Sequence, residues 1–302
     1  MSNANIEKIR HKKNYAYLTP YLFLIPWFIG ISVFRVYPIF ATMWYSLHDF
    51  HPILRTQEFI GLGNFNRMFF DFPHFWDSVA ATLRYVFIGT PMVLIVAFLV
   101  AFILNFKLKG VNLFRTAYYI PSILGGNVAV AIVWTQLFAG NGPINALLGV
   151  FGIEPVSWIL DPFFAPFTLV FLSAWQFGSV MLIFLAALQN VSTSLYEAAS
   201  IDGASKTRQM FSITIPLVSP VILFNTINVL IRHFQEFNAA FLITERGPLR
   251  ATDFLNILIY EYAFLRLEYG FASAMSLILL AAIGVFTLIL FISSKYWVHY
   301  SD

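Results

Sequence analysis

The sequence predicts an all-α integral membrane protein with six transmembrane helices, on the combined evidence of composition, segment length and charge placement. Of its 302 residues, 59% are hydrophobic and 11% are charged, whereas about a quarter of the residues in a soluble domain are charged. Six apolar segments reach the length of about 20 residues that a helix needs to cross a bilayer. The chain has no cysteine, which excludes disulfides and thiolate metal sites.

The six apolar segments define one transmembrane domain, 20–293, between an N-terminal tail, 1–19, and a C-terminal tail, 294–302. The segments are 20–46, 82–105, 116–139, 166–188, 217–237 and 272–293. The first is too long for a signal peptide and lacks a small-residue cleavage site, so we interpret it as a helix that stays in the membrane. Arg35 and Pro38 predict that this helix breaks near its C-terminal end. Prolines in the other segments are compatible with membrane-spanning helices, because neighbouring helices can hydrogen-bond the backbone carbonyls that proline leaves without a donor.

Positively charged residues predict the orientation, because they are enriched in cytoplasmic loops. If the N-terminus is cytoplasmic, the inner segments hold ten lysines and arginines and the outer loops hold five. The inner ones are Lys8, Arg10, Lys12, Lys13, Lys107, Lys109, Arg115, Lys206, Arg208 and Lys295, and the outer ones are Arg55, Arg67, Arg246, Arg250 and Arg266. All seven lysines fall on the inner side. We therefore expect a multi-pass protein of the cytoplasmic membrane with both termini in the cytoplasm.

The polar run between the fourth and fifth apolar segments carries the signals of two short helices. Ser194 and Glu197 have the spacing of a capping box, which satisfies free N–H groups at a helix start. Gly203 can adopt a positive φ and end that helix. Residues 204–213 are predicted to form a second short helix, and Pro216 then begins the next apolar segment. The run predicts a helix–turn–helix at the membrane surface.

The spacing in this run resembles the EAA signature of the membrane subunits of ATP-binding-cassette importers. The sequence EAASIDGA, followed by IPL-x-x-P, is similar to the carbohydrate branch of that family, the maltose and glycerol-phosphate type. Ile215 stands where the family usually has leucine. The resemblance implies a type I importer permease whose loop 189–216 is the coupling element that docks on the ATPase. The implied coupling residues are Glu197, Ala198, Ala199, Asp202, Gly203, Ile213 and Pro216.

The resemblance also implies the partners of the chain. The first helix would wrap a second, homologous permease subunit, and the carbohydrate branch favours a different chain for that subunit. Two ATPase subunits would bind ATP and Mg²⁺, and an extracytoplasmic solute-binding protein would deliver a sugar or oligosaccharide. Apart from these proteins and membrane lipid, we expect no partner, and in particular no nucleic acid, because the basic residues form no aromatic-interleaved patch.

The chain itself is expected to hold no cofactor, no metal and no catalytic residue. The run GASKT, 203–207, is not a phosphate-binding loop, because Ser200 and Ser205 occupy both glycine positions of that motif. The six histidines are scattered and form no set of metal ligands in helical register. ATP hydrolysis is therefore expected on partner chains.

The outer loops carry weaker signals. The run FIGLGNF, 59–65, resembles the vGLxNF segment of sugar-type permeases, and residues 65–76 predict an amphipathic helix in the outer interface, with or without contact to a partner. Residues 141–143, Asn-Gly-Pro, predict a turn. The run TERGP, 244–248, resembles the T-x-G-G-P of sugar-type permeases, with Arg246 in place of the first glycine.

Polar residues in the fifth apolar segment are the strongest sign of a substrate pathway. Asn225, Asn228, Arg232, Gln235 and Glu236 fall within an arc of about 100° on an α-helix, so they share one face. Such a face avoids lipid, and it lines either a water-filled pathway or the contacts between helices. Arg232 and Glu236 are four residues apart and are predicted to pair. This pairing favours a neutral sugar, with glycerol phosphate or another anionic substrate as the alternative.

Trp175 and Gln176, in the middle of the fourth apolar segment, are a second candidate for substrate contact. An aromatic ring beside an amide suits the apolar faces and the hydroxyls of a sugar, although a packed tryptophan with a helix-bridging glutamine explains the pair equally well. The alternative function is a secondary transporter driven by an ion gradient. No internal repeat is visible for it, and Glu236 is the only candidate for an ion-relaying acid.

Overall fold

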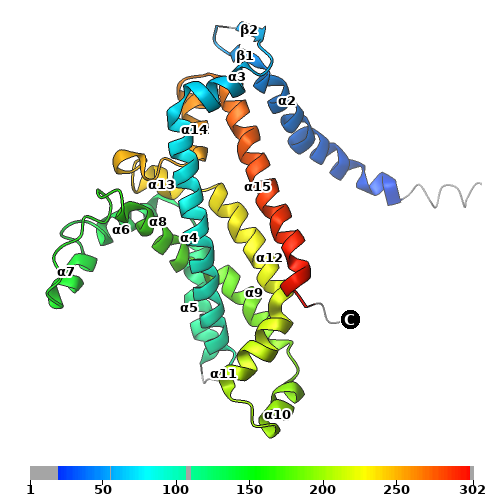
Figure 1. The fold of residues 1–302 in the computed structure, drawn as a ribbon, viewed down its shortest axis with the longest axis vertical. Helices are drawn as coiled ribbons and strands as arrows, with labels where there is room; N and C mark the ends of the chain where they lie inside the picture. Colours follow the sequence, from blue (N-terminus) through cyan, green and yellow to red (C-terminus); the bar gives the residue numbers. More distant parts are fainter. Residues whose placement is uncertain (1–19, 55, 107–109, 300–302) are drawn as a thin grey trace, which may run out of the picture.

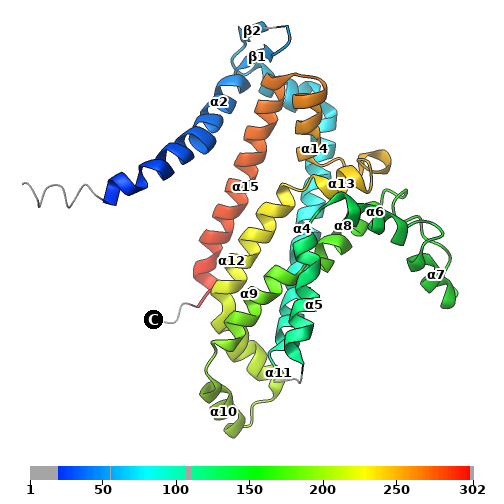
Figure 2. The ribbon, with the colours of Figure 1, turned by 180° about the vertical axis from the view of Figure 1, so that it is seen from behind.

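Long helices packed nearly side by side form the body of the protein (Figure 1). The computed structural model describes residues 20–54, 56–106 and 110–299. The predicted tail 1–19 lies outside the described residues, as do Arg55, Lys107, Lys109 and the last three residues of the chain. A β-hairpin marks one end of the bundle and the short helix α10 marks the other (Figures 1 and 2). We call these the hairpin end and the α10 end.

Four helices in the described part of the chain are long and apolar enough to cross a membrane. They are Pro20–Ser46, Pro73–Leu104 (α4), the range Lys206–Leu242, whose long continuous part ends at Phe234, and Tyr269–Trp297 (α15). They match the first, second, fifth and sixth predicted segments, although α4 begins earlier than expected and α15 extends into the predicted C-terminal tail. The predicted break at Arg35 and Pro38 is wrong, because a π-helical turn, Ser32–Val36 (η1), continues into α2, Tyr37–Ser46. A π turn before the proline tolerates the loss of the backbone hydrogen bond that proline, which has no N–H, cannot make.

The third and fourth predicted segments, 116–139 and 166–188, each contain two helices joined by a bend that the sequence did not predict. The first bend joins α5, Val111–Leu124, to α6, Val128–Leu137, at 107°, and the second joins α8, Phe164–Trp175, to α9, Gly178–Gln189, at 48°. At the first bend Gly125 adopts a φ of +59° and Asn127 Oδ1 accepts a hydrogen bond from the Val130 N–H, which starts α6. The described residues therefore contain six spans if each bent pair counts as one.

The connections between the spans are more ordered than the sequence predicted. They comprise an antiparallel hairpin of β1, His48–His51, and β2, Thr56–Phe59; α3, Gly63–Asn66; η2, Arg67–Asp71; α7, Pro143–Val150; α13, Asn238–Leu242; η4, Pro248–Arg250; α14, Leu255–Tyr260; and η5, Glu261–Leu265. The predicted helix 65–76 is interrupted: the backbone is helical up to Asp71, leaves helical geometry at Phe72 and resumes a helix at Pro73. Pro73 explains this break, since the residue before a proline disfavours the α conformation. Phe75 then lies in the first turn of α4 and is buried.

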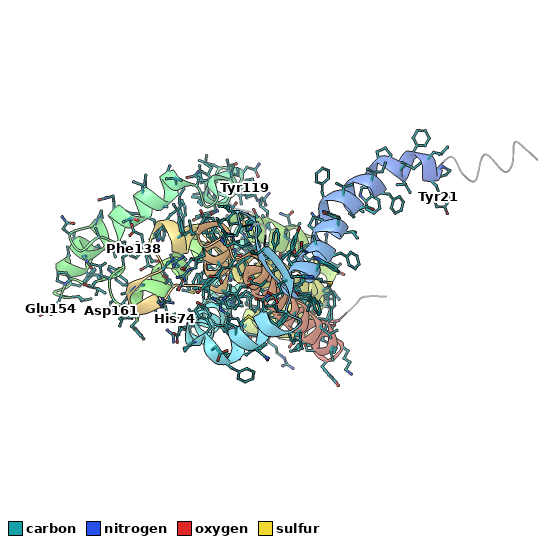
Figure 3. The ribbon with its side chains drawn as sticks, turned by 90° about the horizontal axis from the view of Figure 1, so that it is seen from above. Tyr21, His74, Tyr119, Phe138, Glu154 and Asp161 are labelled. Carbon is teal, nitrogen blue, oxygen red and sulfur yellow. The ribbon has the colours of Figure 1, made fainter. Side chains whose placement is uncertain are left out.

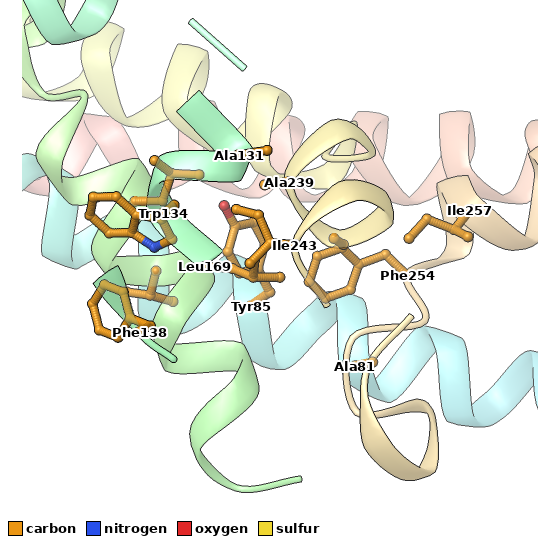
Figure 4. Close-up of a cluster of buried hydrophobic side chains, with 13 residues drawn as sticks. Ala81, Tyr85, Ala131, Trp134, Phe138, Leu169, Ala239, Ile243, Phe254 and Ile257 are labelled. Atoms are coloured by element: carbon orange, nitrogen blue, oxygen red, sulfur yellow. The ribbon is translucent and has the colours of Figure 1, made fainter. Parts of the chain in front are cut away.

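Three clusters of buried apolar side chains hold the helices together, and one of them joins α6 and α8, the bent-span helices that lie next to the bends, to α4 (Figure 4). In that cluster Tyr85 of α4 stacks on Phe254, with ring centroids 4.8 Å apart. Leu169 of α8 is fully buried beside them. Trp134 of α6 donates from Nε1 to the carbonyl oxygen of Thr168 at 3.0 Å. These contacts fix both bent spans against α4.

The first helix stands away from the bundle. Seen from the hairpin end, Tyr21 on this helix and the segment that carries Glu154 and Asp161 lie on opposite sides of the protein (Figure 3). The most apolar window of the helix has no buried residue, and only its last part, α2, packs on α15. Its apolar side chains are therefore left for lipid or for another protein.

Candidate functional site

A cavity of about 420 Å³ lies where the two bent spans meet α12, Ile215–Phe234. Five of the seven residues predicted for the substrate pathway line it: Gln176, Asn228, Arg232, Gln235 and Glu236. Tyr85, Leu169 and Leu172 add an aromatic and apolar part to the wall. Small-molecule sites have volumes of about 300–1,000 Å³ and combine apolar walls with a few polar groups. The cavity matches this description in both size and lining.

The two bends lie next to each other at this cavity. Gln176, at the bend between α8 and α9, donates from Nε2 to the carbonyl oxygen of Gly125, at the bend between α5 and α6, at 3.0 Å. A Cβ on Gly178 would meet the carbonyl oxygen of Tyr118 and would lie 2.8 Å from the Cα of Tyr119. The absence of a side chain at Gly178 thus allows α9 to cross α5 closely. Interrupted helices are a common way to place backbone and polar groups around a membrane-embedded binding site.

The two faces of α12 have the polarity that the sequence predicted. Asn228, Arg232 and Gln235 are exposed at the cavity, whereas Leu230 and Phe234 are buried in the core. The polar face therefore meets open space in the subunit. One amide group is already engaged, because Nδ2 of Asn228 donates to the carbonyl oxygen of Phe224 in the preceding turn at 2.7 Å.

The predicted ion pair between Arg232 and Glu236 does not form. Oε1 of Glu236 instead accepts hydrogen bonds from the backbone N–H groups of Phe237, at 3.0 Å, and of Ala239, at 2.9 Å. The reason is that α12 ends at Phe234, so Glu236 lies beyond the helix and the spacing of four residues no longer places the two side chains together. Glu236 serves as a cap for the start of α13.

Two predicted pathway residues do not line the cavity. Asn225 is 1% exposed, and its Nδ2 has no hydrogen-bond partner among the described residues. Trp175 packs its ring against that of Trp134, with centroids 5.7 Å apart. Trp175 does not lie in the middle of a helix, as the sequence suggested, because α8 ends at that residue.

Sequence reasoning missed a buried polar contact just behind the cavity wall. His233 of α12 is 3% exposed and its Nδ1 lies 2.9 Å from Oγ1 of Thr90 on α4. A Cβ on Gly89 would lie 3.1 Å from the imidazole ring, so a small residue is needed there. The ring of Tyr85 also packs edge-on to the imidazole. The available sequence signal was a histidine next to Arg232 inside an apolar segment.

The predicted coupling loop is exposed at the α10 end. Helix α10, Thr193–Ile201, has no buried residue, and Glu197, Ala198 and Asp202 are exposed while Ala199 is half-buried. The predicted capping box is wrong, because the helix starts two residues earlier, after Ser192 instead of Ser194, and no side chain caps it. Its predicted end is correct: Gly203 has a φ of +77°.

Backbone bonds at Gly203 show how the helix ends. The N–H of Gly203 donates to the Ser200 carbonyl at 3.2 Å, and the N–H of Ala204 donates to the Ala199 carbonyl at 2.9 Å. This pair of bonds is the Schellman motif, which requires a left-handed residue at the position of Gly203. The turn between the two short helices is therefore set by backbone geometry.

Side chains absent from the sequence prediction fasten α10 to the bundle. The Tyr196 hydroxyl lies 2.8 Å from Oγ1 of Thr214, and Nε2 of Gln209 donates to Oγ of Ser200 at 2.9 Å. The predicted separate helix 204–213 is wrong. Helical backbone begins at α11, Lys206–Gln209, and continues through a π turn, Met210–Thr214 (η3), into α12.

Ile213 and Pro216, the last two predicted coupling residues, belong to this continuous helix. Ile213 is half-buried within η3, and Pro216 lies in the first turn of α12. The π turn directly precedes Pro216, where the regular α-helical hydrogen bond is lost. Pro216 therefore does not interrupt the connection from the coupling loop to the cavity.

An ion-pair cluster organises the loop at the hairpin end where Arg246 replaces a glycine. Arg246 adopts a φ of +77°, which is unusual for a residue with a side chain. Its guanidinium pairs with Glu261 at 2.5 Å, and Arg266 pairs with the same carboxylate at 2.6 Å. Burial raises the pKa of Glu261, but the hydrogen bonds from the two arginines outweigh burial and hold this pKa below its ordinary value. The ion pairs compensate for the backbone strain.

Comparison with known proteins decides the family. Residues 61–299 match the family described as the binding-protein-dependent transport system inner membrane component. The chain belongs to this family. The probable ABC transporter permease protein YesP of Bacillus subtilis (strain 168) is 43% identical to this permease, over 94% of this chain and 93% of YesP. The lactose transport system permease protein LacF of Rhizobium radiobacter is 33% identical, over 94% of this chain and 96% of LacF.

A solved structure confirms the fold of the permease. The crystal structure of a bacterial ABC transporter involved in the import of the acidic polysaccharide alginate superposes with a TM-score of 0.82 at 20% sequence identity. The match covers 95% of this chain and 98% of that chain. The family and the importer-permease fold predicted from the sequence are thus confirmed.

Proposed function

We propose that this permease forms one half of a pore that imports a sugar or oligosaccharide across the cytoplasmic membrane. The observation that carries the proposal is a polar cavity on α12 that one continuous helix, Lys206–Phe234, joins to the exposed coupling loop. The similarity to a lactose permease supports a sugar. The basic residues Lys206 and Arg208 at the α10 end support a cytoplasmic location for that end.

The proposal includes four kinds of partner. Two ATPase subunits, which bind ATP and Mg²⁺, would receive α10, and its exposed apolar residues Leu195 and Ile201 support such a docking site. A second, homologous permease, most simply a different chain, would complete the pore and contact the first helix. A solute-binding protein would deliver the sugar at the hairpin end, in keeping with the description of the family as binding-protein-dependent. This permease contributes no catalytic group.

In the proposed mechanism, the ATPases move the coupling loop and the movement opens the cavity alternately to the two sides. Glu197, Ala198, Asp202 and Gly203 would form the docking surface, while Tyr196, Gln209 and Thr214 transmit its displacement to α12. The sugar would bind in the cavity through the amides of Asn228 and Gln235. Release follows when the two bent spans move relative to α12.

Uptake into proteoliposomes that contain the whole complex tests this proposal. We expect uptake of sugar that requires ATP, the ATPases and the loaded binding protein, and that is unaffected when ionophores collapse ion gradients. Uptake that persists without ATP and follows an imposed ion gradient would establish the secondary-transporter alternative instead.

The assignment of the cavity has its own test. Asn228→Ala is expected to raise the transport KM without lowering the melting temperature of the complex, because the side chain faces open space. Thr226→Ala, on the same helix but away from the cavity, serves as the matched control. A lower melting temperature with an unchanged KM for Asn228→Ala would assign this face to packing between subunits.

A further inference from the structure

The cavity contains one cation, Arg232, that no described residue engages in an ion pair or a side-chain hydrogen bond. Arg232 is the only lysine or arginine in the cavity lining. Within the described part of the chain its guanidinium makes no ion pair and no hydrogen bond, unlike Arg246 and Arg266, each of which pairs with Glu261. Arginine remains charged at any physiological pH. The guanidinium is therefore available to a ligand in the cavity.

Glu236, the only carboxylate in the cavity lining, is committed to another role. Its Oε1 accepts two backbone hydrogen bonds at the start of α13. Peptide N–H groups at a helix start stabilise a negative charge without any cation. Glu236 thus has its own partners, and it does not occupy the donors of Arg232.

The remaining polar groups of the cavity are suited to hydroxyls. The side-chain amide of Gln235 has no hydrogen-bond partner among the described residues, and Oδ1 of Asn228 is also left over, since only Nδ2 is engaged. Amides both donate to and accept from hydroxyl groups. Ile231 and Phe237, which line the cavity and are half-buried, supply apolar surface for the CH groups of a sugar ring. One site therefore offers a cation, amides and an apolar wall.

From this combination we infer that the permease carries a sugar acid, whose carboxylate is bound by Arg232 while its hydroxyls meet Gln235 and Asn228. The inference rests on the proposed function and names its substrate class. A planar guanidinium forms two parallel hydrogen bonds to a carboxylate. A sugar phosphate fits less well, because a group with a charge of about −1.5 to −2 would face a single cation and the nearby Glu236. The substrate class is thus a uronate-type sugar, in place of the neutral sugar that a closed Arg232–Glu236 pair predicted.

A thiol probe tests the charge of the cavity without knowledge of the sugar. Because the chain has no cysteine, Asn228→Cys introduces a single thiol into this subunit, four residues from Arg232 on the same helix face. In the reconstituted complex, we would compare its modification by an anionic and a cationic methanethiosulfonate of similar size, with and without Arg232→Gln. We expect the anionic-to-cationic rate ratio to fall about tenfold or more in the double variant, as a nearby cation in a site of reduced dielectric requires. A change of less than about twofold overturns the inference.

Matched ligands then test recognition of the carboxylate. The probes are trisaccharides of glucuronate, galacturonate, mannuronate and guluronate, the methyl esters of the same trisaccharides, and glucose 6-phosphate. We expect at least one acid to be imported and to protect the Asn228→Cys thiol, and its ester to act at least about tenfold more weakly. Arg232→Gln is expected to abolish the difference between acid and ester, and Arg232→Lys to retain part of it.

Three outcomes of the ligand test overturn the inference, and one separates it from the proposed function. Equal handling of acid and ester, preference for the phosphate, or import of a neutral oligosaccharide with a KM that Arg232→Gln leaves unchanged would each refute a sugar acid. If the thiol ratio changes as expected but the whole complex takes up no sugar with ATP, the proposed function fails while the cationic character of the cavity stands.

Discussion

The crossing of α9 and α5 is the most sharply constrained point of the fold, and one methyl group tests it. In Gly178→Ala, the new Cβ would meet the carbonyl oxygen of Tyr118 and lie 2.8 Å from the Cα of Tyr119. Both are backbone atoms, so the two helices must separate to admit the methyl group. Overpacking of this kind costs about 1–3 kcal/mol. Gly178 is the first residue of α9, so the helix propensity that alanine gains in a helix interior does not offset this loss.

Thermal unfolding of the purified permease in detergent measures this effect. We expect Gly178→Ala to lower the melting temperature by several degrees, on a scale of roughly 2–4 °C per kcal/mol for domains of 150–250 residues. Gly284→Ala in α15 is the matched control, because a Cβ there has no atom within 4 Å and the melting temperature should stay constant or rise. If Gly178→Ala melts at or above the control, the close crossing of α5 and α9 is refuted.

Three further substitutions separate packing, coupling and charge. Gly203 has a φ of +77° and open space around it, so Gly203→Val should cost about 1–2 kcal/mol of local backbone strain and abolish ATP-dependent transport with little change in melting temperature. Gly203→Asn is the control, because asparagine tolerates this conformation and should retain transport. A wild-type transport rate in Gly203→Val would contradict the coupling role. Asn225→Leu removes a buried Nδ2 that has no hydrogen-bond partner among the described residues, so we expect about 1–3 kcal/mol of added stability and an unchanged transport KM. A destabilised variant would show that this Nδ2 does have a hydrogen-bond partner. The pKa of Glu261 is lowered in the folded protein, so the ionised carboxylate stabilises the folded state above its unfolded-state pKa, and this stabilisation is lost as the pH falls through the folded-state pKa. The melting temperatures of Glu261→Gln and the wild type should therefore differ at pH 7 and converge in acid. A difference that stays constant with pH would exclude this linkage.

The sequence predicted which residues share a face far better than it predicted where helices bend. Asn228, Arg232 and Gln235 do lie together on the cavity, because one helix period relates them and no other element is needed. The relation of Arg232 to Glu236 fails because it assumes a helix that continues, and α12 ends between them. A pattern with a period of 3.6 residues contains no information about the residue at which the period stops.

The bends illustrate the same limit at the level of the fold. Segment 116–139 is apolar throughout, so hydropathy alone favours one straight span. Gly125 and Asn127 carry a signal for a turn and a helix start, which the prediction from hydropathy did not use. The bond from Gln176 to Gly125 joins residues 51 positions apart and could not be inferred from either segment. Only packing shows that the two bends face the same cavity.

The arrangement of continuous and bent spans indicates how a displacement at the coupling loop can act at the cavity. From Lys206 to Arg232 the helix runs without a break through α11, η3 and α12, a length of about 39 Å at 1.5 Å per residue. Gln209 and Tyr196 tie α10 to the start of this helix. In the proposed mechanism, a movement of α10 would be carried along this continuous helix to Arg232.

The two spans that face Arg232 across the cavity, α5–α6 and α8–α9, are not continuous helices, because each bends at the level of the cavity. A single side-chain hydrogen bond, from Gln176 to Gly125, links the two bends directly, and the close crossing at Gly178 lies beside it. When α12 moves, α6 and α8 can change their angles to α5 and α9 without breaking a continuous helix. In the proposed mechanism, a continuous helix on one side of the cavity and two bends on the other would allow the distance between Arg232 and the opposite wall to change while the α10 end stays attached to an ATPase.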